Sequence, residues 1–194
     1  MNWADIVRQA WSDYSEGDAY ADPVICEQGG MRMQERLAWL ASVCASLTDG
    51  DLVEIGAYEG LTTMQLVPIA KRFRRRVIAI DPWDGVQVGG EIQYERFQEN
   101  LHGYEDVLSI VRQRSQDATV VETLKSIPLC FVFVDGLHSY EAVQSDLAAV
   151  GHCGGLVAVD DCSWNEGIRR AVRECGRDVL MNGRFREAYV LPKE

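Results

Sequence analysis

Residues 51–60 read DLVEIGAYEG, a short apolar run followed by a turn that contains two glycines. Gly56 allows the chain to turn sharply, and Gly60 allows the next helix to approach closely and present its backbone N–H groups. A second apolar run, RVIAI at 76–80, ends at Asp81 after an intervening helical segment. Strand, helix and strand in this order predict two parallel strands joined by a helical crossover.

The same alternation continues to the end of the chain. The expected strands are 51–55, 76–80, 107–111, 129–134, 155–159, 178–181 and 187–191, and the expected helices between them are 60–72, 91–101, 117–126, 139–150 (N-cap Ser139) and 165–175. Continuous apolar strands separated by helices predict an α/β, Rossmann-like doubly wound sheet that is mostly parallel and covered on both faces. In such sheets a ligand binds beyond the carboxyl ends of the strands, so the residues at those ends are the candidates for a site.

The first fifty residues carry a different pattern. Helices are expected at 2–11 and at 31–47, where apolar residues recur at helical spacing. Residues 20–30, YADPVICEQGG, are expected to be irregular because Gly29 and Gly30 adopt unusual backbone angles readily. This part of the chain is therefore predicted to be a helical extension of the α/β core.

Length and composition indicate one ordinary globular domain. The chain has 194 residues, of which 47% are hydrophobic and 25% charged. No repeat, low-complexity tract or linker marks an internal boundary. We expect a single domain over 1–194, made of an N-terminal extension at 1–50 and a cofactor-binding core at 51–194.

Charge and targeting signals limit the classes of partner. The formal net charge is −11, which disfavours nucleic acid as a partner. The basic run KRFRRR at 71–76 is interpreted as the solvated end of a helix, where cations suit the helix dipole. No apolar stretch is long enough to span a membrane, the first residues do not resemble a signal peptide, and none of the six cysteines forms a C-x-x-C pair, so a cytoplasmic location is expected.

The first turn argues against a dinucleotide. A dinucleotide-binding turn has the pattern G-x-G-x-x-G, in which the middle glycine makes room for a pyrophosphate. Tyr58 occupies the middle position here, and its side chain would crowd a pyrophosphate. An NAD-dependent oxidoreductase is therefore disfavoured, and a nucleoside without phosphates fits better. At the end of the second strand, Asp81 can accept both hydroxyls of a ribose, and Trp83 is either a stacking partner for an adenine or a core residue.

The most specific stretch is 131–147, FVFVDGLHSYEAVQSDL. It places Asp135 at a strand end and His138 at the start of the following helix, where an imidazole can take a proton from a hydroxyl. The pair Asp160–Asp161 is expected at the neighbouring strand end. Three clustered carboxylates repel one another unless a cation compensates, and oxygen ligands suit Mg²⁺.

Together, LVEIGAYEG, VIAIDPW, the 131–147 segment and GGLVAVDD resemble class I S-adenosylmethionine-dependent methyltransferases, over about residues 50–175. Within that class the similarity is to small-molecule O-methyltransferases related to the metal-dependent macrolide sugar methyltransferases. The resemblance implies a seven-stranded sheet whose last strand is antiparallel. It also implies methyl transfer from S-adenosylmethionine to a hydroxyl of a small molecule, with assistance from Mg²⁺.

Carried over by position, the resemblance gives each candidate residue a role. Glu54, Gly56 and Gly60 belong to the cofactor-binding turn, with Glu54 and Gly56 lining the methionine part. Asp81 holds the ribose, and Ser115 and Gln116 lie near the adenine. The implied metal ligands are Asp135, Asp160 and Asp161, and the implied catalytic residues are His138 as the base together with Asp135.

Several points remain open from the sequence. Metal-dependent relatives of this kind are longer, so the acceptor pocket is expected to come from residues 1–50, the loop at 84–90 or a partner subunit of a homo-oligomer. Residues 1–50 are interpreted as either a lid or an interface, and Trp164, after the acid pair, as within reach of the acceptor. The acceptor's identity is not encoded in any motif. Two alternatives remain: a metal-independent methyltransferase, in which Asp135 binds the methionine amine, and a non-catalytic cofactor-binding module.

Overall fold

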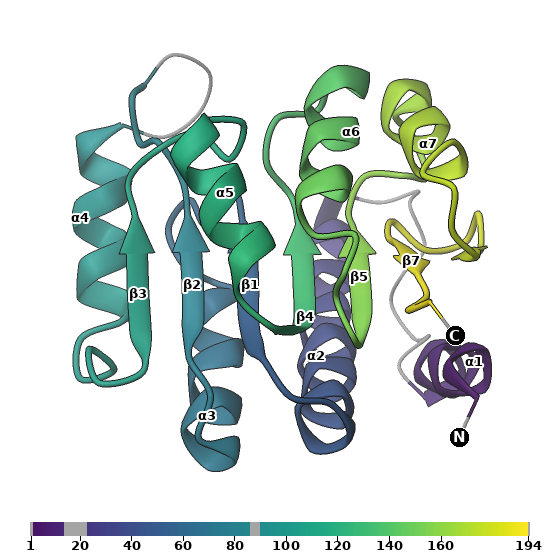
Figure 1. Ribbon diagram of the computed structural model, residues 1–194, viewed down its shortest axis with the longest axis horizontal. Helices are drawn as coiled ribbons and strands as arrows, with labels where there is room; N and C mark the ends of the chain where they lie inside the picture. Colours follow the sequence, from purple (N-terminus) through teal and green to yellow (C-terminus); the bar gives the residue numbers. More distant parts are fainter. Residues whose placement is uncertain (1, 14–22, 86–89, 194) are drawn as a thin grey trace.

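The computed structural model describes residues 2–13, 23–85 and 90–193, and within the second helix it describes side chains from Met33 onward. Figure 1 shows the arrangement of its helices and strands. In chain order they are α1 (Trp3–Asp13), α2 (Pro23–Leu47), β1 (Asp51–Ile55), α3 (Thr63–Phe73), β2 (Val77–Ile80), α4 (Glu91–Asn100), β3 (Leu108–Val111), α5 (Ala118–Ser126), β4 (Leu129–Val134), α6 (Tyr140–Ala149), β5 (Leu156–Val159), α7 (Glu166–Arg173), β6 (Val179–Met181) and β7 (Ala188–Val190).

The strands form one seven-stranded sheet in the order β3-β2-β1-β4-β5-β7-β6. Strands β1 to β5 pair in parallel, whereas β7 is antiparallel to both β5 and β6. The chain moves outward from β1 to β3 and then returns to place β4 on the other side of β1. The crevice beyond the carboxyl ends of β1 and β4 is therefore the topological switch point at which such sheets bind ligands. The doubly wound fold with an antiparallel last strand, predicted from the sequence, is confirmed.

Helices cover both faces of the sheet. Side chains of β1 alternate between the faces, so that Leu52 lies in one buried cluster and Val53 in the other. The first cluster also contains residues of α1, α2, α3 and α4, and the second contains residues of α5, α6 and α7. In Figure 1, α5, α6 and α7 lie in front of the sheet and α2 and α3 behind it. This two-sided burial explains why β2, β4 and β5 are apolar at every position.

The expected helix and strand boundaries agree with the structure within three residues, with one exception in the N-terminal extension. Helix α2 begins at Pro23 rather than at Met31, so the expectation of irregular chain up to residue 30 is wrong for 23–30. Gly29 and Gly30 lie inside the helix, where each glycine costs about 1 kcal/mol relative to alanine. Proline is favoured at the first position of a helix, where its missing N–H has no intrahelical partner in any case. Residues 20–22 lie outside the described residues.

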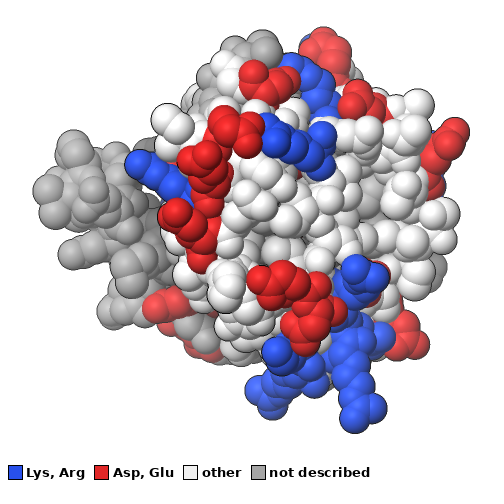
Figure 2. Space-filling view, turned by 90° about the vertical axis from the view of Figure 1, so that its left-hand side faces the viewer, with Lys and Arg blue, Asp and Glu red and all other residues white. Residues whose placement is uncertain are grey.

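The basic run 71–76 closes α3. Its cations pair with nearby acids: Lys71 Nζ lies 3.4 Å from Asp106 Oδ2, and Arg75 Nη2 lies 2.9 Å from Asp49 Oδ1. Figure 2 shows the edge of the molecule on the side of α4 and β3, where Lys and Arg side chains gather at the lower end beside acidic ones. This local pairing agrees with the interpretation of a solvated helix end. Within the described ranges, no helix has both the length and the apolar character needed to cross a membrane.

Candidate functional site

A cavity of about 410 Å³ lies beyond the carboxyl ends of β1, β2 and β4. The described residues that line it come from the turn after β1, from Asp81, Pro82 and Asp84 after β2, and from the segments 114–116 and 135–139. Cavities of this size hold small molecules, and this one lies where the topology of the sheet predicts a ligand.

The turn after β1 needs glycine for reasons of packing. Gly56 has a φ of +92°, and a Cβ added there would lie 2.1 Å from the backbone oxygen of Asp135. The end of β1 thus passes so close to the end of β4 that only glycine fits. Gly60 has a φ of +83°, and a Cβ there would meet the ring of Phe97 at 2.9 Å, so it packs against α4. Of the two glycines, only Gly56 lines the cavity.

Asp81 ends β2 and points its carboxylate at the turn after β1. Its Oδ2 accepts a hydrogen bond of 3.0 Å from the N–H of Tyr58, and its Oδ1 accepts one of 2.8 Å from the N–H of Trp83. Burial raises the pKa of Asp81, and these two hydrogen bonds act in the opposite direction. Asp81 is therefore a fixed acceptor that also lines the cavity, as a ribose-binding residue must be.

Trp83 does not lie where a stacking partner for an adenine would. It is 2% exposed, packs against Tyr94 and Phe97, and does not line the cavity. Its indole N–H donates a 2.7 Å hydrogen bond to the backbone oxygen of Tyr58. Of the two interpretations of Trp83, the structure thus supports that of a core residue. Its hydrogen bond supports the turn that carries Tyr58, and Tyr58 does line the cavity.

Glu54 lies next to the cavity rather than in its lining. The side chain is 2% exposed and accepts a hydrogen bond from the hydroxyl of Thr63 at the start of α3. Burial raises the pKa of Glu54 to about 8, and the hydrogen bond from Thr63 partly offsets this effect. Ile55 and Gly56, at the end of β1, line the cavity in its place.

Ser115 and Gln116, which follow β3, line the cavity, and their place near an adenine stays a prediction. The Gln116 amide N–H₂ donates to Ser115 Oγ at 2.6 Å and to Asp146 Oδ1 at 2.9 Å. Asp146, on α6, is 1% exposed, and burial raises its pKa to about 6. Asp146 falls in the 131–147 segment, but the sequence assigns it no role, because nothing in its spacing shows that it faces Gln116.

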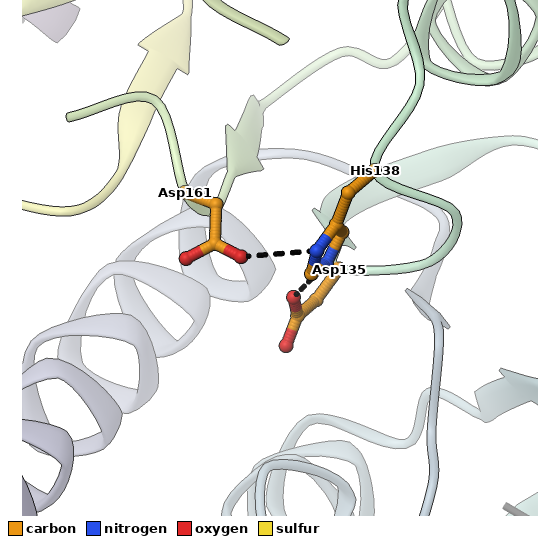
Figure 3. Close-up of side chains that lie close together, drawn as sticks. All are labelled: Asp135, His138 and Asp161. Carbon is orange, nitrogen blue, oxygen red and sulfur yellow. Dashed lines mark ion pairs between the residues drawn. The ribbon is translucent and has the colours of Figure 1, made fainter. Parts of the chain in front are cut away.

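His138 lies between two carboxylates, as Figure 3 shows. Its Nε2 is 3.4 Å from Asp135 Oδ1, and its Nδ1 is 3.3 Å from Asp161 Oδ2. One ligand atom from each of the three residues can be chosen so that all lie within 4.8 Å of one another, a spacing that could hold a metal ion. The hydrogen bond to Asp135 and the negative charge of Asp161 raise the pKa of His138. Burial raises the pKa of Asp135.

Asp160, the third expected metal ligand, has a different neighbour. Arg186 donates to both of its carboxylate oxygens, with Nε 3.2 Å from Oδ1 and Nη2 2.7 Å from Oδ2. The group that the structure brings together therefore contains Asp135 and Asp161, as expected, with His138 in place of Asp160. The reason is that a guanidinium matches a carboxylate at both oxygens and occupies the side of Asp160 that a cation would use.

Two features beside Asp161 complete this end of the site. Asp161 has a φ of +61°, an uncommon backbone conformation for a residue other than glycine and one that is concentrated at functional sites. Trp164 donates its indole N–H to Asp161 Oδ1 at 2.6 Å and meets the His138 ring edge-on at 6.0 Å, yet it is 54% exposed. Trp164 thus lies beside His138 and Asp161, and its reach to an acceptor stays a prediction. The loop expected at 84–90 falls partly on 86–89, outside the described residues.

Sequence reasoning missed Arg186, although one signal pointed to it. An antiparallel β7 beside β5 starts where β5 ends, with Ala188 opposite Val159. The residues just before β7 must therefore lie next to the acid pair that follows β5, and Arg186 is the cation among them.

Comparison with known proteins identifies the family of this chain. Residues 53–162 match the model of a family described as a methyltransferase domain. No curated protein sequence matches the chain.

Solved structures share the fold at low sequence identity. CalS11, a TDP-rhamnose 3′-O-methyltransferase of calicheamicin biosynthesis, is 14% identical with a TM-score of 0.68, covering 97% of this chain and 93% of its own. TomG, an O-methyltransferase from Streptomyces achromogenes solved with S-adenosylmethionine, is 16% identical with a TM-score of 0.62, covering 97% and 90%. An O-methyltransferase from Bacillus cereus is 12% identical with a TM-score of 0.57, covering 96% and 89%. With its family match, its sheet order and its cavity at the switch point, the chain belongs to the methyltransferase-domain family and is a class I S-adenosylmethionine-dependent methyltransferase.

Proposed function

We propose that this methyltransferase transfers the methyl group to a hydroxyl oxygen of a small molecule, with His138 as the base. The observation that carries the proposal is the position of His138, which lines the cofactor cavity and also lies 3.3 Å from Asp161 on the other side. The imidazole thus lies at the edge of the cavity, beside Asp161 and Trp164. A hydroxyl held at this edge would be in reach of both the base and the methyl group of the cofactor.

The cavity residues fit S-adenosylmethionine by their chemistry. A nucleoside needs an acceptor for its ribose hydroxyls and polar groups near its base, and Asp81, Ser115 and Gln116 supply them from the cavity wall. Bound S-adenosylmethionine supplies an electrophilic methyl carbon on a positively charged sulfur. The protein's main contribution is then to align the hydroxyl with the methyl group. Proximity can lower an activation barrier by about 7–11 kcal/mol in favourable cases, and we expect alignment to supply several kcal/mol here.

His138 is suited to accept the acceptor's proton. Its neutral ring would remove the proton from the hydroxyl as the methyl–oxygen bond forms, and the resulting imidazolium would face the carboxylates of Asp135 and Asp161. The same carboxylates raise the pKa of His138, which makes it a stronger base. The separations of 3.3 and 3.4 Å are long for charged hydrogen bonds, so the ring is not locked to either partner.

The spacing of three side chains also favours assistance of methyl transfer by a divalent cation. Asp135, His138 and Asp161 offer ligand atoms within 4.8 Å of one another, and carboxylate oxygens suit Mg²⁺. A cation held by Asp135 and Asp161 would lower the pKa of a substrate hydroxyl bound beside it. A nitrogen of His138 that bound the ion could not also accept a proton, so His138 is either ligand or base at that atom.

The test is transfer of an isotopically labelled methyl group to a panel of hydroxylated small molecules, read by mass spectrometry. We expect a labelled methyl ether and one equivalent of S-adenosylhomocysteine per turnover. His138→Gln should lower the rate at least 100-fold while its cofactor affinity stays within about threefold of wild type. His102→Gln, at an exposed position, is the matched control and should behave like wild type.

Two results would contradict the assignment. Turnover of His138→Gln equal to that of His102→Gln would remove the base. Products labelled on nitrogen or sulfur rather than on oxygen would remove the hydroxyl acceptor. Addition of a chelator tests the cation separately, because only a metal-assisted reaction loses activity in it.

A further inference from the structure

Arg186 binds both members of the acid pair Asp160–Asp161. Its Nε and Nη2 donate to Asp160, and the same Nη2 donates to Asp161 Oδ1 at 2.7 Å. One guanidinium thus covers both oxygens of the first carboxylate and one oxygen of the second. The remaining oxygen, Asp161 Oδ2, is the one that faces His138.

This acid pair needs a fixed cation. Asp160 and Asp161 are each 2% exposed, and they are adjacent in the chain. Two buried neighbouring carboxylates repel each other and lose their hydration, unless a positive charge with suitable hydrogen bonds compensates. Arg186 provides that charge from a half-exposed position, since its side chain is 39% exposed. An arginine suits this task better than a lysine because its planar fork matches carboxylate geometry.

The residues on either side of Arg186 point away from the acid pair and contact the N-terminal helices α1 and α2. Phe185 is 3% exposed; Trp11 of α1 stacks on it at 5.4 Å with an interplanar angle of 4°, and the guanidinium of Arg36 lies 4.7 Å from its ring centre. Figure 1 shows α1 beside the β7 end of the sheet. The N-terminal helices therefore contact the chain one residue before Arg186.

Glu187 anchors the chain one residue after Arg186. Its carboxylate forms an ion pair with Arg36 of α2, and both side chains are fully buried. The hydroxyl of Tyr189 donates to Glu187 Oε1 at 2.9 Å. Residues 185 and 187 thus face α1 and α2, while Arg186 between them faces the site.

We propose that Arg186 is a positioning residue that acts as the fixed counter-charge of the acid pair, and that α1 and α2 hold it in place through Phe185 and Glu187. Arg186 binds both carboxylate oxygens of Asp160. The carboxylate oxygens that face His138 are therefore Asp161 Oδ2 and Asp135 Oδ1. The inference rests on the proposed function, because that function places Asp160 and Asp161 beside the bound acceptor, at what we call the acceptor end of the site. It gives the N-terminal helices the task of bracing that end, in addition to covering the sheet.

Mn²⁺ binding by the full-length protein, without cofactor or acceptor, tests this assignment. Replacing Arg186 by Gln removes the competing charge and frees Asp160, so the site should bind Mn²⁺ about five- to tenfold more tightly in calorimetry or electron paramagnetic resonance. Arg186→Lys keeps the charge and should stay within about twofold of wild type. Arg184→Gln is the matched control, because it removes the same charge from an exposed position on the same turn.

The outcomes are distinct from those of the methyl-transfer test. Unchanged or weaker Mn²⁺ binding by Arg186→Gln, including no binding by any variant, would overturn the role of Arg186. An equal gain in Arg184→Gln would also overturn it, since the effect would then be one of overall charge. Failure of methyl transfer leaves the Mn²⁺ comparison intact, because the comparison uses neither cofactor nor acceptor.

The bracing is tested from α1, away from the ligand atoms. Trp11→Leu removes the ring stacked on Phe185 and should tighten Mn²⁺ binding about two- to threefold by loosening Arg186. Combined with Arg186→Gln, it should add nothing further, because the residue it positions is already gone. Unchanged binding in Trp11→Leu, or full additivity in the double variant, would overturn the bracing by the N-terminal helices.

Discussion

The two ends of the site are built in different ways. At the cofactor end, Asp81 is held by the N–H groups of Tyr58 and Trp83, all of which lie in turns that directly follow strands. At the proposed acceptor end, Asp160 and Asp161 are hydrogen-bonded by Arg186, which comes from the final hairpin and whose neighbours Phe185 and Glu187 contact α1 and α2. The cofactor end is therefore a property of the strand-to-helix turns, whereas the acceptor end is a property of the whole tertiary structure.

This difference suggests how acceptor and cofactor binding can vary separately. A change in the hairpin or in the N-terminal helices would alter the charge beside His138 without touching the turn that holds Asp81. Substitutions that separate the two ends are the most informative, and their expected effects decrease in the order Asp81, Glu54, Asp146 and Trp164.

Asp81→Asn should affect the cofactor end alone. An amide cannot accept from both backbone N–H groups and also receive the ribose hydroxyls, so the affinity for S-adenosylmethionine should fall about 30- to 100-fold, or ~2–3 kcal/mol. Mn²⁺ binding at the acceptor end should stay within about twofold. Isothermal calorimetry measures both, and Asp106→Asn, at an exposed ion pair with Lys71, is the control. Equal cofactor affinity in the two variants would contradict the role of Asp81.

Glu54→Gln tests how the buried carboxyl of Glu54 affects the pH dependence of stability. Burial raises the pKa of Glu54 to about 8, above its ordinary value of 4.5, so the folded protein holds this proton more tightly than the unfolded chain. The free energy of unfolding of wild type should then fall as the pH rises from about 4.5 to 8. Glutamine removes this contribution, so denaturation at pH 5 and at pH 8 should show the variant gaining about 1–3 kcal/mol on wild type at the higher pH. Parallel pH profiles would show that Glu54 is ionised in the fold.

Asp146→Asn probes the support behind Gln116. Asp146 Oδ1 accepts from the Gln116 amide, and an asparagine can present its N–H₂ group instead, which would turn Gln116 away. Cofactor affinity should drop about three- to tenfold, with the thermal midpoint nearly unchanged. Glu141→Gln, at an exposed position on the same helix, should have no effect. The same loss in both variants would mean that α6, rather than Asp146, was being disturbed.

Trp164→Phe should produce the smallest effect and only at the acceptor end. Phenylalanine keeps a ring near His138 but loses the indole N–H that donates to Asp161 Oδ1. For whichever acceptor of the panel is turned over, KM should rise about threefold while cofactor affinity stays constant. A change in cofactor affinity instead would place Trp164 at the wrong end of the site.

The fold could be predicted from the sequence because its signals are local. Strands β2 and β4 are continuous apolar runs, and the residues that follow them, Asp81 and Asp135, mark the edge where the site lies. The start of α2 could not be predicted in the same way, because Gly29 and Gly30 weaken a helix without ending it.

The site could be predicted only where the contacting residues lie close together along the chain. Asp135 and His138 are three residues apart and were found together. Asp160 was predicted as a metal ligand from the clustered acids and the resemblance. Its partner Arg186 lies 26 residues further on and was not found from the sequence, because only the pairing of β7 with β5 brings the two together. Trp83 carried two interpretations, and the packing of Tyr94 and Phe97 around it decided between them.

The most direct test of the central claim is a calorimetric titration of the purified protein with S-adenosylmethionine, beside NAD as a control. The cavity at the switch point, with Asp81 and Gln116 in its wall and Tyr58 where a pyrophosphate would need space, predicts binding at one site with a Kd on the order of micromolar, and no binding of NAD. Absence of S-adenosylmethionine binding, or equal binding of NAD, would contradict the account.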